Sequence, residues 1–165
     1  MTIGGEVGLA IYIFPLVMAA ISDLHSLRIP NWLTAALAAA FPPVALLFGH
    51  NVDWLSHFAA GIAVFAGAAA LFAFGFMGGG DAKLLAATAL WTGLGQLLTL
   101  LVFTALAGGL LALFMILLRH PVAQASFLAT VRRLPSFAQK NTPIPYGIPI
   151  AVAGILMAPS LGFLV

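Results

Sequence analysis

The chain has no cysteine and very little charge. The absence of cysteine excludes disulfides, thiol nucleophiles and zinc sites built from thiolates. Only 6% of its 165 residues are charged, whereas soluble domains average about 25%, and 63% are hydrophobic. A soluble domain of this length has too little interior to bury so much apolar surface, so lipid must surround much of the chain.

Other features are also missing. The N-terminus lacks the basic region of a cleavable signal peptide, its first charge is Glu6, and its apolar run is too long for such a peptide. Six basic residues are scattered along the chain and form no patch, so we expect no nucleic-acid partner. No internal repeat is visible. We therefore treat residues 1–165 as a single transmembrane domain.

The apolar runs predict an all-α, polytopic membrane protein with six transmembrane helices. A helix needs about 20 apolar residues to cross a bilayer. The expected spans are 3–21, 32–48, 54–76, two within 82–118, and 146–165. We place the break within 82–118 at residues 92–96, where Gly93 and Gly95 interrupt the run. The three tryptophans fall near the expected interfaces, as in an aromatic belt.

The basic residues orient these spans. Cytoplasmic segments of membrane proteins are enriched in Lys and Arg. If the N-terminus is outside, segments 22–31, 77–83 and 119–145 face the cytoplasm, and they contain all the Lys and Arg of the chain: Arg28, Lys83, Arg119, Arg132, Arg133 and Lys140. We therefore expect the N-terminus outside. Residues 122–134 are equally compatible with a short interfacial helix and with a solvated basic loop.

Two aspartates share the predicted cytoplasmic boundary. Asp23 ends the first span and Asp81 begins the fourth. Ionisable residues at membrane depth are costly and usually mark a functional site. The alternative is that both are simply interfacial, with Arg28 neutralising Asp23 and Lys83 neutralising Asp81. From position alone the two interpretations are about equal.

The length of the apolar run at 82–118 favours the functional interpretation. After a short turn, each of its two crossings is about 25 Å long, which is less than the ~30 Å hydrocarbon core. One crossing must therefore begin inside the membrane. The glycines at 78–80 are the natural place, because glycine permits close approach and unusual dihedral angles. We expect Asp81 to be recessed in a water-accessible site; the alternative is a flexible connector.

Two such carboxyl groups, if close, have a definite chemistry. The helix dipole favours a negative charge on Asp81 at a helix start and disfavours one on Asp23 at a helix end. A close pair would then share one proton asymmetrically. Such a pair can activate water while it protonates a peptide carbonyl, which hydrolyses an amide without metal, serine or cysteine.

Three motifs resemble those of the prepilin peptidases. Gly78-Gly79-Gly80-Asp81 matches the GxGD motif of membrane aspartic proteases. Asp23, followed by Arg28-Ile29-Pro30-Asn31, resembles the first aspartate block of prepilin peptidases. Pro145-Tyr146-Gly147 resembles the segment that enters their last helix. The three occur in the family's order, and the similarity spans nearly the whole chain.

The resemblance implies an aspartic endopeptidase of the bacterial inner membrane, with Asp23 and Asp81 as the catalytic pair. It would remove the basic leader from type IV pilin-like precursors at the cytoplasmic face. Its partners would be the leader and first transmembrane segment of prepilins, and the bilayer, with no cofactor and no metal. Larger members also methylate the product and carry a tetracysteine domain. This chain lacks cysteine, so it resembles the short Flp or tight-adherence type.

The supporting residues have plainer interpretations as well. Pro30 suits the first turn of a helix, where its missing N–H is no loss. Arg28 and Lys83 serve equally as topology charges or as partners of the carboxylates or the substrate. The histidines are divided between the two faces, so they form no single metal site: His25 and His120 inside, His50 and His57 outside.

Two alternative functions stand beside the prepilin peptidase. One is a GxGD protease of the signal-peptide-peptidase kind, although those enzymes carry a tyrosine–aspartate pair on the preceding helix, and Asp23 follows Ser22. The other is a small proton-coupled transporter in which Asp81 and Lys83 relay protons. Transporters usually contain a structural repeat, and the chain shows none.

Overall fold

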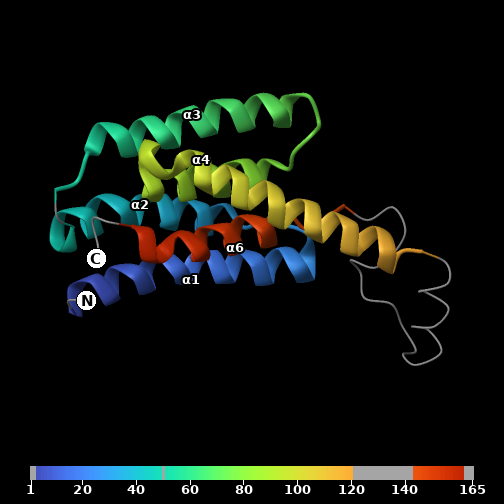
Figure 1. Cartoon of the computed structure of the whole chain (residues 1–165), viewed down its shortest axis with the longest axis horizontal. Coiled ribbons are helices and arrows are strands. Elements are labelled where there is room, and N and C mark those ends of the chain that lie inside the picture. The colour runs from blue at the N-terminus through green and yellow to red at the C-terminus, as the bar shows by residue number, and fades with distance from the viewer. Residues whose placement is uncertain (1–2, 50, 121–142, 162–165) are drawn as a thin grey trace.

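The computed structural model describes residues 3–49, 51–120 and 143–161, and in these ranges every regular element is helical (Figure 1). The elements in chain order are α1 (Ile3–Ser26), α2 (Asn31–Phe48), α3 (Trp54–Ala73), α4 (Gly79–Leu118), α6 (Gly147–Met157) and the 3-10 turn η2 (Ala158–Ser160). The predicted all-α class is confirmed for this part of the chain. Residues 122–134, for which a short interfacial helix and a solvated loop were equally compatible, lie outside the described residues, as does Lys140.

Four of these helices, α1 to α4, are long and apolar enough to cross a membrane, so the chain is a multi-pass membrane protein. The predicted count of six spans is not confirmed. Helix α6 has 11 residues and gives way to η2, whereas the sequence predicted a span over 146–165. An α-helix of that length is about 16 Å long, which is too short to cross a ~30 Å core.

Helix α1 is longer than expected, because it continues past residue 21 to Ser26 and so includes Asp23. The next residue, Leu27, has a left-handed backbone (φ 53°) and closes the last turn through a hydrogen bond from its N–H to the Asp23 carbonyl (2.9 Å). Helix α3 is shorter than expected and ends at Ala73.

Helix α4 contains the break that the sequence predicted at residues 92–96. Gly93 has φ 71° and ψ 174°, and the chain reverses there (Figure 1). At about 1.5 Å per residue, the first limb (79–92) is about 21 Å long and the second limb (94–118) about 37 Å. The expectation of two equal short crossings is therefore wrong, and only the first limb is shorter than the hydrocarbon core.

Two side chains of α3 replace the hydrogen bond that is lost at the reversal. In an unbroken helix the Leu94 N–H would donate to the Leu90 carbonyl. Instead it donates to Ser56 Oγ (2.9 Å), and His57 Nδ1 donates to the Leu90 carbonyl (2.8 Å). Both backbone groups are satisfied, as a lipid environment requires.

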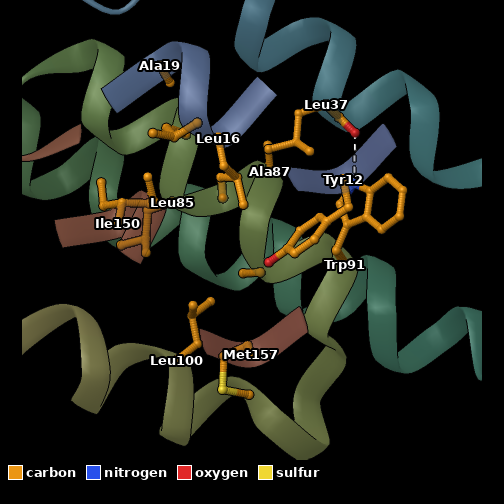
Figure 2. Packing of buried hydrophobic residues seen from close by; sticks show 14 of the residues in the cluster. Tyr12, Leu16, Ala19, Leu37, Leu85, Ala87, Trp91, Leu100, Ile150 and Met157 are labelled. Atoms are coloured by element: carbon orange, nitrogen blue, oxygen red, sulfur yellow. Dashed lines mark hydrogen bonds between the residues drawn. The ribbon is translucent and has the colours of Figure 1, made fainter. Parts of the chain in front are cut away.

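The first limb of α4 lies inside the bundle, because α4 packs on α3, α6 and α2, and Trp91 in this limb contacts Tyr12 of α1 (Figure 2). Trp91 is fully buried there, which corrects its expected place in an aromatic belt, and its indole N–H donates to the Leu37 carbonyl (2.8 Å). Tyr12 lies 5.0 Å from it, centroid to centroid, and donates to the Gly154 carbonyl (3.1 Å). These bonds satisfy the polar ends of both rings and fix the limb against three helices.

The two aspartates come to the same end of the bundle. Figure 1 shows the α1–α2 turn, the α3–α4 loop and the start of α6 at one end, and the start of α1, the α2–α3 connection and the reversal within α4 at the other. The end that carries the aspartates also carries Arg28 and Lys83. Placement of the N-terminus outside stays a prediction.

Candidate active site

Asp23 is held in the last turns of α1, and its side chain is only 4% exposed. The turn that follows is fixed by hydroxyl groups, because Ser22 Oγ and Ser26 Oγ both donate to the Arg28 carbonyl (2.8 and 3.3 Å). Local hydrogen bonds of this kind are typical of serines at the end of a helix. They set the path of the chain from Asp23 to α2.

Asp81 lies in the first turn of α4, where its carboxylate accepts a hydrogen bond from the backbone N–H of Gly78. Gly78 is the N-cap residue of the helix, and a Cβ on it would lie 2.6 Å from Asp81 Oδ2. The expected unusual dihedral angles are absent, since none of the glycines at 78–80 has a positive φ. At these positions glycine provides space.

A single pocket of about 650 Å³ contains both carboxyl groups. Its walls come from the α1–α2 turn at 27–29, the α3–α4 loop with the first residues of α4 at 75–80, and the segment 143–146. The two groups are close enough for the charge of Asp23 to act on Asp81. The structure therefore brings together two residues that are 58 positions apart in the sequence.

Gly147, the first residue of α6, completes the surroundings of Asp23. Its N–H donates to Asp23 Oδ2 at 2.7 Å, and this bond is buried. A Cβ on Gly147 would lie 2.9 Å from both Asp23 Oδ2 and Ile29 Cδ1, so only glycine fits. The motif Pro145-Tyr146-Gly147 singles out this residue, but nothing in the sequence indicates that its backbone N–H binds Asp23. Pro145 is buried beside it, and Tyr146 is exposed and lines the pocket.

Lys83 and Asn31 are paired with each other and do not line the aspartate pocket. Lys83 Nζ donates to Asn31 Oδ1 at 2.9 Å, which links the start of α4 to the start of α2. The sequence suggested that Lys83 neutralises Asp81, but in the structure Lys83 binds Asn31. The start of α4 also meets the α1–α2 turn, where a Cβ on Gly80 would lie 3.1 Å from Ile29 Cβ.

Pro30 and Arg28 shape the turn between these contacts. Pro30 is the N-cap of α2, with φ −60° and ψ 133°, one position before the expected first turn. Arg28 has an exposed side chain that lines the aspartate pocket, while its carbonyl accepts the serine hydroxyls. The turn thus presents a cation at the mouth of the pocket and leaves the carboxyl groups inside.

The arrangement suits acid–base chemistry. Each carboxylate is oriented by one backbone N–H, from Gly147 or from Gly78, which leaves an oxygen of each group for a ligand. In the described ranges no three His, Asp or Glu side chains gather as a metal site would require.

A comparison with protein families matches the chain to the type IV leader peptidase family over residues 10–113, more than half of the chain. The chain belongs to this family. Its members are peptidases, so the protein is a leader-peptidase-like protease of the membrane, and a transporter function has no support. The matched range includes Asp23 and Asp81 and ends before Pro145. Searches of curated proteins and of solved structures give no match.

Proposed function

We propose that this leader peptidase relative is an aspartic endopeptidase that removes the basic leader of Flp-type prepilins. Asp23 and Asp81 are the catalytic pair, and the site faces the cytoplasm of a bacterial inner membrane. The observation that carries the proposal is the shared pocket, in which two carboxyl groups from distant helices interact and no other acid takes part.

The two carboxyl groups act as an acid–base pair that shares one proton. Each accepts a hydrogen bond from a backbone N–H at a helix start, Asp81 from Gly78 at α4 and Asp23 from Gly147 at α6. The charged group takes a proton from a water molecule, the water oxygen attacks the scissile carbonyl carbon, and the protonated group gives its proton to the carbonyl oxygen. The group that took the proton from water then gives it to the leaving amine, while the other group takes a proton back from a hydroxyl of the intermediate; this breaks the C–N bond, re-forms the carbonyl and returns the pair to its starting state.

The cytoplasmic orientation rests on charge. Arg28 lies in the α1–α2 turn, Lys83 near the start of α4 and Arg119 directly after α4, and Figure 1 shows these parts toward the end that carries the pocket. Glu6, near the start of α1, and Asp53, directly before α3, belong to the opposite end. Cytoplasmic ends carry the excess of Lys and Arg, so the pocket opens toward the side on which unprocessed leaders are made.

The purified protein should cut a prepilin at one bond. We suggest incubating it in detergent with Flp-type prepilins that retain their basic leader and apolar segment, and measuring product masses. One new N-terminus just before the apolar segment is expected. Intact substrate throughout, with protein that is folded by thermal unfolding, would contradict the proposal.

A further inference from the structure

A second cavity, of about 590 Å³, lies between α2, α3 and the first limb of α4. We call it the lateral groove. Its lining includes small residues from all three helices, namely Ala35, Ala38, Gly61, Ala86 and Ala87. Small side chains let another backbone approach closely, which is how helices associate in lipid.

The groove forms because α3 packs mainly on α4 and meets α2 only near its own start, where Trp54, His57 and Phe58 contact the ring of Phe41. Its α3 side carries Ile62 and Phe65, whose side chains are 68% and 50% exposed. An α-helix is about 10–12 Å across with its side chains, so a cavity of this volume receives one face of a helix and not the whole. The groove is therefore shaped for lateral contact from the bilayer.

One end of the groove is polar, and it is the end nearest the aspartate pocket. Lys83 and Asn31 lie there, and Lys83 is the cation of the lining. An ammonium group has three donors, of which one is used by Asn31. The others suit a carboxylate or peptide carbonyl. Gly80 and Ile29, which lie close together and line the pocket that holds Asp81, precede Lys83 and Asn31 by three and two residues.

We propose that the lateral groove binds the apolar segment of the substrate that follows the cleaved bond, as a transmembrane helix. The proposal rests on the proposed function. The helical part packs on the small residues, and the unwound part crosses the polar end, where Lys83 donates to carbonyl oxygens that no helix satisfies. The scissile bond then lies over Asp23 and Asp81.

A pair of neighbouring alanines on α2 provides a matched test. Ala35 lines the groove, and Ala36 is also exposed but does not. For Ala35→Phe we expect KM for an intact prepilin to rise about tenfold or more, which is the loss of roughly 1.4 kcal/mol of binding. Cleavage of a short soluble peptide that spans only the scissile bond should be unchanged. Ala36→Phe should leave both substrates unaffected.

Other results decide against the groove. If Ala35→Phe and Ala36→Phe behave alike, or if Ala35→Phe affects the short peptide equally, the groove does not hold the apolar segment. If Ala35→Phe leaves cleavage of both substrates unchanged and alters only how far anionic lipid vesicles raise the thermal stability of the protein, a lipid occupies the groove. The unmodified protein is the control for the proposed function. If it cuts neither substrate, the proposed peptidase function is wrong, whatever the groove binds.

Disulfide crosslinking locates the segment directly, because the chain has no cysteine of its own. We expect Ile62→Cys, in the groove, to crosslink to prepilins with one cysteine in the apolar segment. Leu106→Cys, which is similarly exposed at 66% on the second limb of α4, should not. Crosslinks to a second copy of the chain at Ile62→Cys, or equal yields at both positions, would overturn the proposal. Cleavage measured in the same samples reports on the catalytic function separately.

Discussion

The two ends of the first limb of α4 use glycine for different reasons. At the start, Gly78 and Gly80 have ordinary backbone angles, and the space beside them is occupied by Asp81 and Ile29. At the end, Gly93 has φ 71° and ψ 174°, a conformation essentially restricted to glycine. Substitution at the start should therefore reduce catalysis, whereas substitution at the end should reduce stability.

The largest effect should come from the carboxylates at the start of the limb and on α1. We expect Asp23→Asn and Asp81→Asn each to reduce the rate of prepilin cleavage by about a thousandfold or more, because an acid and a base are both required. Rates are measured with purified, folded protein.

Asp53→Asn is the control for these variants. Asp53 caps α3 at the opposite end, where its carboxylate accepts from the Ser56 N–H (3.1 Å), and asparagine caps equally well. The Asp53→Asn variant should cleave prepilins at the rate of the unmodified protein. Substantial activity in either Asp23→Asn or Asp81→Asn would remove the catalytic pair from the mechanism.

The next largest effect is expected at the glycines that begin α4, and it tests whether they are needed because they leave space. Gly80→Val should lower cleavage about a hundredfold, because the added atoms push α4 from Ile29 and displace Asp81. Gly79→Ala should be close to the parent, since its Cβ would meet only the exposed ring of Phe72 at 3.3 Å. If Gly80→Val loses activity only in step with its thermal stability in detergent, packing alone explains the motif.

Gly147→Ala extends the same idea to α6. The new methyl group would lie 2.9 Å from Asp23 Oδ2, so the carboxylate must move while its hydrogen bond from the N–H is strained. We expect about a tenfold fall in kcat for prepilin cleavage. An unchanged kcat would show that the position of Asp23 is not set by this contact.

A smaller effect on cleavage, but a clear one on stability, is expected at the reversal. Gly93→Ala should reduce the free energy of unfolding by about 1–3 kcal/mol. The molecules that remain folded should keep most of their activity. Gly95→Ala is the control, because Gly95 has open space around it and no positive φ, so alanine should be neutral or slightly stabilising. Equal stability of the two variants would contradict the assigned role of Gly93.

The smallest effect is that of chelators. The chain has no thiolate ligand, and the described ranges bring no group of histidines and carboxylates together. EDTA should therefore leave the cleavage rate unchanged. A loss of activity that added metal restores would mean that the carboxylates hold a metal ion.

The sequence predicted the features that depend on local pattern. The apolar runs indicated four helices that the structure contains, and the paired glycines at 93 and 95 located the reversal. The charge distribution placed Asp23 and Asp81 at the same face, and the structure brings them to one end of the bundle and into one pocket.

Features that depend on packing between distant segments were not predictable. Lys83 and Asn31 are 52 residues apart, and the bond from Gly147 to Asp23 joins residues 124 apart. Nothing in the local sequence of either partner indicates the other. His57 is the clearest omission, since it was treated as one of four isolated histidines and is in fact buried against the reversal.

The replacement of the lost helical hydrogen bond by α3 has a consequence for biosynthesis. Ser56 and His57 precede Gly93 in the chain, so they leave the ribosome before the backbone groups that they satisfy. We expect α3 to be in the membrane already when the first limb of α4 emerges, and to serve as the template on which that limb turns. A chain synthesised in the reverse order of these two helices would expose a bare N–H and a bare carbonyl to lipid, at a cost of several kcal/mol each. Circularly permuted variants, compared for membrane insertion, would show whether the order of synthesis matters as much as the contacts.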